Sequence, residues 1–125
     1  MKNKYINNLK HAIYTFKHII CINKLAIKYK VWKIKYLFHD ADKLFMYIFL
    51  FWKSVKDIHT IHRLNSNHHL ENISSKNIDW EMAVLDWECA RFTKPDKPLN
   101  ARETLEKYYS EYKSNCLPIL EKLGL

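Results

Sequence analysis

Glycine is almost absent from this chain of 125 residues, since the only one is Gly124. Tight hairpins and phosphate-binding loops both depend on glycine, because their backbones adopt positive φ angles or approach a ligand closely. Long stretches rich in Lys, Leu, Ile and Glu contain few helix breakers, which is typical of helices. The length fits one domain with its own core. We therefore expect residues 1–125 to form a single all-α bundle of about five to six helices.

Apolar periodicity, caps and prolines place these helices along the chain. Asp79 is positioned to cap a helix that runs to about Phe92, and Pro95 and Pro98 mark the connection that follows it. The polar stretch 64–77 is typical of a loop with at most a short helix. Further helices are predicted over residues 5–29, 31–42, 44–60 and 100–122, the last one bent at Pro118.

The first predicted helix is apolar along two opposite stripes. His11 and His18 lie seven residues apart and therefore share one stripe, together with Ile22 and Leu25. The opposite stripe contains Leu9, Ile13, Phe16, Ile20 and Ile27. A helix that is apolar on two sides is expected at the centre of a fold, with its histidines facing the interior. Histidines that face solvent are the alternative.

The next segments are also expected to be buried. In the helix over 31–42, the side chains of Val31, Ile34 and Phe38 are predicted to point inward. The nine-residue run Leu44–Trp52 is entirely apolar and aromatic, but it is too short to span a bilayer. We expect it to be a deeply buried helix, in preference to a segment that lies on a membrane surface or binds a partner.

Positive charge is concentrated in the first half of the chain. Residues 1–60 contain 12 Lys and 3 acidic residues, whereas residues 61–125 contain 9 basic and 10 acidic residues, for a net charge of +8. A basic half attracts anions such as phosphate esters, nucleotides or nucleic acid. The alternative is a solvated lysine surface in an organism whose codons favour Lys, Ile and Asn.

Three cysteines, Cys21, Cys89 and Cys116, are odd in number and far apart. They predict reduced thiols in a reducing compartment, not a disulfide framework. The basic start is interrupted by charged and histidine residues, so no signal-peptide core is expected. These features predict a cytoplasmic protein.

The doublet His39-Asp40 is the first candidate for chemistry. Adjacent helical residues point about 100° apart, so both reach one metal ion only at the edge or end of a helix. The two carboxylate oxygens of Asp40 suit a bridge between two metals. Lys43 follows three residues later on the same face, where an ammonium group would neutralise a phosphate oxygen. A surface cap beside a lysine is the alternative.

Asp86 lies in the middle of an apolar stripe formed by Met82, Leu85 and Cys89. A buried carboxylate without a partner is costly, so a metal ion, an arginine or the amides of a helix end must compensate it. A metal shared with His39 and Asp40 is one solution. A salt bridge to Arg91 or Arg63 is the other.

Four of the seven histidines, His59, His62, His68 and His69, fall within 11 residues. Neutral imidazole is a common ligand for Zn, Fe, Mn, Co and Ni. Glu71 is close enough in sequence to orient a ligating histidine. A chance cluster of surface histidines is the alternative.

Taken in order, these residues resemble the HD-domain superfamily of metal-dependent phosphohydrolases. In that family a histidine ligand of the first helix precedes an aliphatic seam, here His11 followed by Thr15, Ile22 and Leu25-Ala26. The His-Asp doublet of the family follows, here His39-Asp40, 28 residues after His11. Its last ligand is an aspartate on a later helix, here Asp86. His18 is the alternative first ligand.

Phosphodiesterase-type members insert a further histidine and a His-His pair, which here look like His62 and His68-His69. The resemblance covers about residues 8–92. It is nearest to small uncharacterised HD-like proteins of bacteria and phages, whose pattern is similar through Asn67-His68-His69 and Met82-x-x-x-Asp86-Trp87.

The resemblance implies an all-helical phosphohydrolase with one or two divalent transition-metal ions, drawn from Mn, Fe, Zn, Co and Ni. Its first metal would take His11, His39, Asp40 and Asp86 as ligands, and its second Asp40, His62, His68 and His69. Asp40 and Lys43 would be catalytic, through a metal-activated water, and Lys43, Arg63 and Asn67 would contact substrate. The expected partner is a phosphorylated small molecule or nucleotide, with nucleic acid and a second copy of the chain as further candidates and no membrane partner.

Three other functions fit the same residues. A non-catalytic basic module, such as a phage-type inhibitor or a nucleic-acid binder, would use the lysines and exposed aromatic residues, with Tyr29, Trp32 and Tyr36 as candidates. An iron oxygenase would use the same ligands on the same scaffold. A purely structural bundle would leave the histidines without a ligand.

Overall fold

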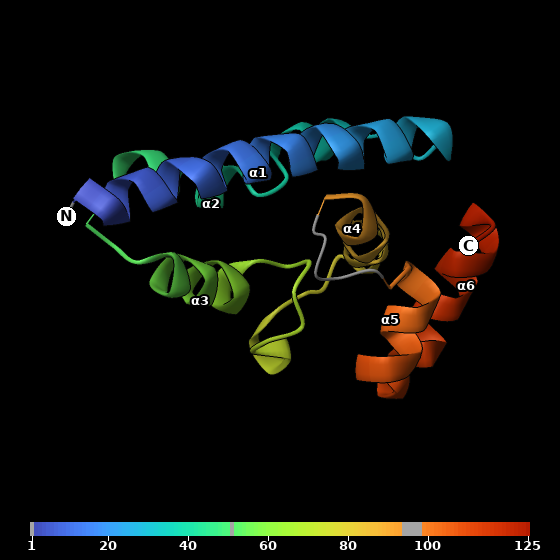
Figure 1. Cartoon of the computed structure of the whole chain (residues 1–125). Coiled ribbons are helices and arrows are strands. Elements are labelled where there is room, and N and C mark those ends of the chain that lie inside the picture. Colours follow the sequence, from blue (N-terminus) through green and yellow to red (C-terminus); the bar gives the residue numbers. More distant parts are fainter. Residues whose placement is uncertain (1, 51, 94–98) are drawn as a thin grey trace.

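The computed structural model describes residues 2–50, 52–93 and 99–125, and over these residues the chain is helical without strands, as predicted (Figure 1). No helix among the described residues combines the length and the apolar character needed to cross a bilayer. The elements are α1 (Lys2–Lys28), η1 (Ile34–Phe38), α2 (Ala41–Phe49), α3 (Val55–Asn65), η2 (Ile73–Ser75), α4 (Trp80–Thr93), α5 (Ala101–Tyr108), η3 (Ser110–Tyr112) and α6 (Lys113–Leu123), where η denotes a 3-10 helix.

Helix α4 occupies the centre of the fold, between α1 above and the α5–α6 pair below (Figure 1). Four consecutive residues of α4, Met82 to Leu85, are buried, as are Trp87 and Cys89. They pack with Ile22 and Ala26 of α1 and with Leu105 and Leu120 of α5 and α6. The prediction that the first helix is central is therefore wrong, because a helix buried all round is the one that must be central.

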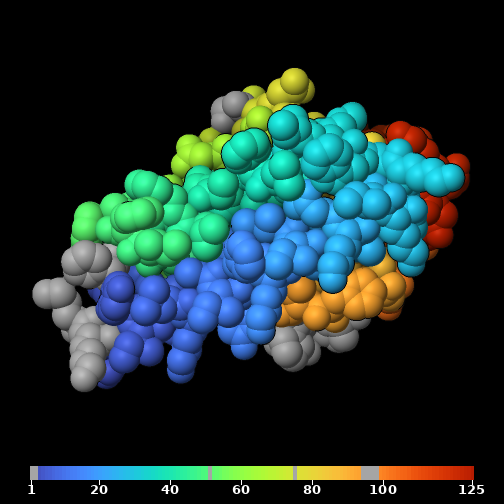
Figure 2. Space-filling view, turned by 90° about the horizontal axis from the view of Figure 1, so that it is seen from above, coloured from blue at the N-terminus to red at the C-terminus, as the bar shows by residue number. Residues whose placement is uncertain are grey.

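Helix α1 lies at the surface, with one side on the core and the other open. Ile22 is completely buried, whereas Ile13, Phe16 and Ile27, on the opposite stripe, remain more than half exposed. Figure 2 shows α1 running along the outer face of the molecule, beside η1 and α2. Both stripes are apolar, but only the one that carries His18 packs inward.

The predicted helix over residues 31–42 is wrong, because the chain breaks at His39 and Asp40. Element η1 ends at Phe38 and α2 begins at Ala41. Asp40 between them has a φ of 57°, in the left-handed region, which short polar side chains such as aspartate tolerate better than most. The doublet thus sits at the start of a helix, where both side chains can face one centre.

The burial predicted for residues 31–52 is also wrong in part. Val31, Met46 and Tyr47 are buried, but Ile34 and Phe38 are exposed, as are Phe45, Ile48, Phe49 and Trp52. The predicted helix over 44–60 is divided, because Ser54 Oγ accepts a hydrogen bond from Asp57 N and caps a new helix, α3. Met46 and Tyr47 pack with Ala12 and Ile58 in a second, smaller core.

Caps also define the second half of the chain. Asp79 Oδ1 accepts from Met82 N, which confirms the predicted cap of α4. Asn100 and Glu103 form a capping box at the start of α5. The helix predicted over 100–122 is interrupted after Tyr108, upstream of Pro118, so that Tyr109 stacks on Trp87 with ring centroids 5.0 Å apart. Pro95 and Pro98 lie outside the described residues.

Candidate metal centre

Two groups of histidine and aspartate side chains meet at Asp40. One group contains His18, His39, Asp40 and Asp86, and the other contains Asp40, His62, His68 and His69. Within each group, the atoms available as ligands all lie within 4.8 Å of one another. Asp40 is common to both, so its carboxylate stands between two clusters of imidazoles.

The first group joins α1, the η1–α2 junction and α4. Asp86 Oδ1 lies 2.5 Å from His18 Nε2 and 3.1 Å from His39 Nε2. The two imidazole Nε2 atoms are 3.1 Å apart. Asp40 Oδ2 lies 3.6 Å from His39 Nε2 and 3.9 Å from His18 Nε2. Three segments far apart in sequence therefore present nitrogen and oxygen atoms to one small region.

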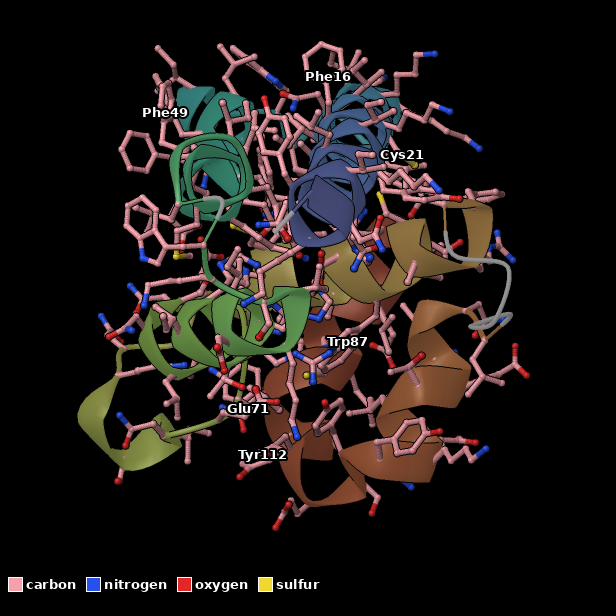
Figure 3. The ribbon with its side chains drawn as sticks, turned by 60° about the vertical axis from the view of Figure 1, so that its left-hand side comes forward. Phe16, Cys21, Phe49, Glu71, Trp87 and Tyr112 are labelled. Atoms are coloured by element: carbon pink, nitrogen blue, oxygen red, sulfur yellow. The ribbon has the colours of Figure 1, made fainter. Side chains whose placement is uncertain are left out.

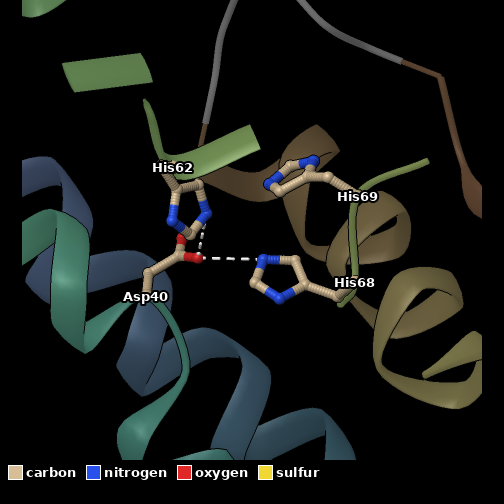
Figure 4. A group of neighbouring side chains, drawn as sticks. All are labelled: Asp40, His62, His68 and His69. Atoms are coloured by element: carbon tan, nitrogen blue, oxygen red, sulfur yellow. Dashed lines mark ion pairs between the residues drawn. The ribbon is translucent and has the colours of Figure 1, made fainter. Parts of the chain in front are cut away.

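The second group joins the same junction to α3 and the loop after it (Figure 4). Asp40 Oδ1 lies 2.9 Å from His62 Nε2 and 3.0 Å from His68 Nε2. His69 completes the group, with its ring centroid 4.9 Å from that of His62 and 4.5 Å from that of His68. Asp40 thus uses one oxygen toward each group.

The contact between Asp40 and His62 is close but poorly directed for a hydrogen bond. Asp40 Oδ1 and His62 Nε2 are fully buried, and neither has a hydrogen-bond partner of good geometry among the described residues, despite their 2.9 Å separation. Buried polar atoms are normally paired, because leaving one unpaired costs its full desolvation energy.

Three of the imidazoles contact a side-chain oxygen through Nδ1, on the side of the ring away from the centre. Asp42 Oδ2 lies 2.9 Å from His62 Nδ1, Ser66 Oγ lies 2.7 Å from His68 Nδ1, and Thr93 Oγ1 lies 3.4 Å from His18 Nδ1. A donor hydrogen on Nδ1 leaves Nε2 as the lone-pair atom. In each of these residues Nε2 is the atom nearest to Asp40 or Asp86. This arrangement is typical of metal-ligating histidine.

The carboxylates of the centre are held in their charged form. Burial alone raises the pKa of Asp40, but His39, His62 and His68 outweigh it and hold that pKa well below its usual range. For Asp86, burial is likewise overcome by His18 and His39, and its pKa is also well lowered. Both groups therefore stay anionic at neutral pH and are suited to a cation.

The histidines divide by their surroundings. Burial lowers the pKa of His39, and it lowers that of His69 to about 2, so both rings are neutral. For His62, burial lowers the pKa, but contacts with Asp40 and Asp42 dominate and raise it to about 9. In the metal-free protein His62 therefore carries a proton that partly neutralises the two aspartates.

Most of the predicted ligands come together, and one does not. His39, Asp40, His62, His68, His69 and Asp86 lie in the two groups. The first-helix position is filled by His18, the alternative candidate, because His11 packs against Tyr47 and His59, at centroid distances of 5.6 and 5.8 Å. The predicted use of His11 as a member of this cluster is therefore wrong.

The salt-bridge alternative for Asp86 is wrong as well. Arg91 pairs with the buried Glu88, 2.6 Å away, and Arg63 pairs with Glu71 at 4.0 Å. Glu71 accordingly contacts an arginine, with no contact to a ligating histidine recorded among the described residues. Asp86 is compensated by two imidazoles instead.

The predicted substrate residues lie around the centre with different exposures. Lys43 is half-buried in the first turn of α2, three residues after Asp40. Arg63 is half-buried and already paired with Glu71. Asn67 has an exposed side chain, and its carbonyl oxygen accepts from Asp79 N. Of the three, Lys43 and Arg63 carry cationic groups, and each is close in sequence to a member of the ligand groups.

Sequence reasoning missed the oxygens that orient the imidazoles. Asp42 stands in the same His-Asp-Ala-Asp-Lys segment as the ligands and carried a signal, since its carboxylate was the second one in that segment. Ser66 is two residues before His68, and such short local contacts are common. Thr93 lies 75 residues from His18, and nothing in the sequence connects the two.

Solvent reaches the centre at Asp86, whose side chain is 15% exposed, and at the half-buried His69. An open groove of about 590 Å³ lies elsewhere, lined by Asn3, Lys4, Ile6, Asn7, Lys10, Ser54 and Val55. No member of the two ligand groups lines that groove. No protein-family model, curated protein or solved structure matches the chain.

Proposed function

We propose that the chain is a metal-dependent phosphohydrolase whose centre binds one or two divalent transition-metal ions. The donor set suits these ions, because imidazole nitrogen and carboxylate oxygen are ligands for Zn, Fe, Mn, Co and Ni. Two carboxylates and five imidazoles supply the two groups, with Asp40 shared between them. The cysteines take no part in either group, which argues against a soft, thiolate-bound metal.

One observation carries the proposal. The buried Asp40 Oδ1 and His62 Nε2 are 2.9 Å apart without a hydrogen bond of good geometry between them, and Asp42 and Ser66 contact the Nδ1 atoms of the two imidazoles next to Asp40. A cation coordinated by these atoms would satisfy them together.

The order of ligands along the chain supports a hydrolytic reaction, since it resembles that of HD-domain phosphohydrolases. Divalent ions bound there would act as Lewis acids toward a phosphoryl group and lower the pKa of water toward neutrality. Asp40 would hold both halves of the centre at a fixed separation, and Asp42 would keep His62 in the tautomer that presents Nε2. Lys43 would contribute positive charge beside a phosphate oxygen.

Metal analysis of purified variants tests the centre. Wild type should retain divalent metal after exhaustive dialysis, Asp40→Ala should lose it from both groups, and His18→Ala should lose it from one. His11→Ala is the matched control, since it removes a histidine of the same helix that lies outside the cluster, and it should keep full metal content. Unchanged metal in a folded Asp40→Ala protein would remove the proposal.

Activity assays on a generic phosphodiester, a phosphomonoester and nucleotides then separate the functions. The proposal expects hydrolysis that depends on added metal, is lost in Asp40→Ala and survives in His11→Ala. Bound iron with substrate-dependent oxygen uptake and no hydrolysis would identify an oxygenase. A nucleic-acid module has lost part of its basis, because Tyr36 is buried, and it would show salt-sensitive binding unaffected by His39→Ala.

A further inference from the structure

The outer stripe of α1 is a line of exposed apolar side chains. From Ile6 to Ile20 its members recur at alternating spacings of three and four residues, and Ile27 follows seven residues later, which keeps them all on one side of the helix. Ile13 is 58% exposed, Phe16 56% and Ile27 63%. The stripe comprises Ile6, Leu9, Ile13, Phe16, Ile20 and Ile27.

The elements beside α1 extend this surface. Figure 3 shows Phe16 on α1 and Phe49 on α2 projecting outward from the upper layer of the molecule, away from α5 and α6, and Figure 2 shows α1, η1 and α2 lying alongside one another. We call the exposed apolar residues of these three elements the outer face. Beyond α1 they are Ile34, Leu37 and Phe38 of η1 and Phe45, Ile48 and Phe49 of α2.

Scattered apolar residues on a protein surface need no explanation, but a contiguous set of this size marks an interaction site. The opposite side of α1 is already committed, since Thr15, Ile22 and Ala26 are buried in the fold. A partner on the exposed side of α1 would therefore lie along the surface of the helix, because inserting α1 further would open the core.

Charge decides which partner fits. Residues 1–39 contain nine lysines and no aspartate or glutamate. Lys10, Lys17 and Lys24 are exposed and seven residues apart, so they form a line along one side of the apolar stripe. A second copy of the chain would place like charges against like charges, and an uncharged partner would leave them unused.

We propose that the outer face of α1, η1 and α2 docks on the surface of a membrane that contains anionic phospholipid. The isoleucine and phenylalanine side chains enter the boundary between headgroups and acyl chains, and the lysines meet the lipid phosphates. This division between an apolar side and a lysine side is typical of helices that lie in the plane of a membrane interface. The sequence predicts no membrane partner and a deeply buried helix over residues 44–52, but Phe45, Ile48 and Phe49 of that run are exposed.

The proposed docking does not depend on the metal centre. Phe16 and His18 are two residues apart and therefore point about 200° from each other around α1. His18 faces Asp86 in the interior, and Phe16 faces outward. Substitutions on the outer face should consequently leave the metal content unchanged, which separates failure of this proposal from failure of the proposed function.

Vesicle flotation with the full chain tests the docking. Wild type should float with vesicles of equal parts phosphatidylcholine and phosphatidylglycerol, and should bind pure phosphatidylcholine at least about tenfold more weakly. Binding to the mixed vesicles should fall steeply as salt is raised. The tryptophan emission, to which the exposed Trp32 and Trp52 contribute, should also shift to the blue on addition of the mixed vesicles.

Two variants and a control make the test specific. Phe16→Ser and, on the neighbouring helix, Phe49→Ser should each weaken flotation about tenfold or more. Tyr108→Ser changes a residue of α5 that is 60% exposed but far from the outer face, and it should float like wild type. Circular dichroism and metal content verify that each variant is folded.

The proposal is overturned if wild type fails to float, or if it binds both kinds of vesicle equally. It is also overturned if the chain sediments as a dimer that Phe16→Ser dissociates while no vesicle binds, because the outer face would then be an interface between copies. A charge-reversal variant is the last test. Lys10→Glu combined with Lys17→Glu should abolish the preference for anionic vesicles.

Discussion

Removing the carboxylate of Asp42 should weaken metal binding to an extent that depends on pH. His62 Nδ1 lies 2.9 and 3.0 Å from the two Asp42 oxygens, and the bond keeps the ring turned so that Nε2 faces Asp40. Loss of such an orienting partner typically costs about tenfold to 100-fold in metal affinity. Because the Asp42 side chain is 53% exposed, water can replace it in part. We therefore expect the lower end, about tenfold, or about 1.4 kcal/mol.

Proton competition opposes this effect near neutral pH. Asp42 also helps to raise the pKa of His62 to about 9 in the metal-free protein. Near pH 7 the proton on Nε2 must leave before a cation binds, at a cost of about 2.7 kcal/mol for two pKa units. Asp42→Ala lowers this pKa and reduces the competition. The affinity loss should therefore be close to its full tenfold value above about pH 9 and should shrink toward pH 7.

Competition titrations with a chelator and Co²⁺ or Zn²⁺ measure this difference at the two pH values. Asp42→Asn keeps an acceptor oxygen and should fall between wild type and Asp42→Ala. Asp57→Ala is the control, because it removes one negative charge from the exposed first turn of α3, and it should bind metal normally. An equal loss at both pH values, or no loss in a folded Asp42→Ala protein, would refute the reasoning.

Three further predictions concern stability. In the metal-free protein, the free energy of unfolding of wild type should exceed that of His62→Gln below pH 6.5, and this difference should fall by about 3 kcal/mol as pH rises through 9. The reason is that the pKa of His62 is raised in the folded state. Urea unfolding across this range measures the difference, and a difference that does not change with pH would contradict the prediction. Glu88→Ala should lower the free energy of unfolding by about 1–3 kcal/mol, since the buried carboxylate accepts a hydrogen bond from Ala101 N and pairs with Arg91. Glu88→Gln should lower it less in the same assay. Asn100→Ala removes the cap of α5 and should lower the free energy of unfolding by about 1 kcal/mol. The control is Asn115→Ala at an exposed position, which should unfold like wild type.

The all-helical class was predictable because breakers are rare, but the buried side of each helix was not. In α1 both stripes are apolar, and the more hydrophobic one, with Ile13 and Phe16, stays outside. Periodicity identifies a stripe without saying what lies against it. The helix break at Asp40 was hidden for a similar reason. A left-handed residue was not expected there, because the segment lacks glycine and the conformation depends on tertiary contacts.

The ligand types were predictable, and the exact first-helix ligand was not. His11 and His18 occupy the same side of α1, so helical periodicity cannot distinguish them. His18 is the ligand because its position along the helix axis places it opposite Asp86 of α4. That position depends on how the two helices pack. The contact of Thr93 with His18 could not be predicted from the sequence for the same reason.

The ligand groups connect parts of the chain that are remote in sequence. His18 and His39 are 21 residues apart, His39 and Asp86 are 47 apart, and His18 and Asp86 are 68 apart. A cation bound at this centre would act as a cross-link that closes all three intervals at once, and the loops it closes are long enough to restrict the unfolded chain substantially. Removal of the cation by a chelator would then destabilise the folded state. The time that this small bundle stays folded would therefore depend on the supply of metal.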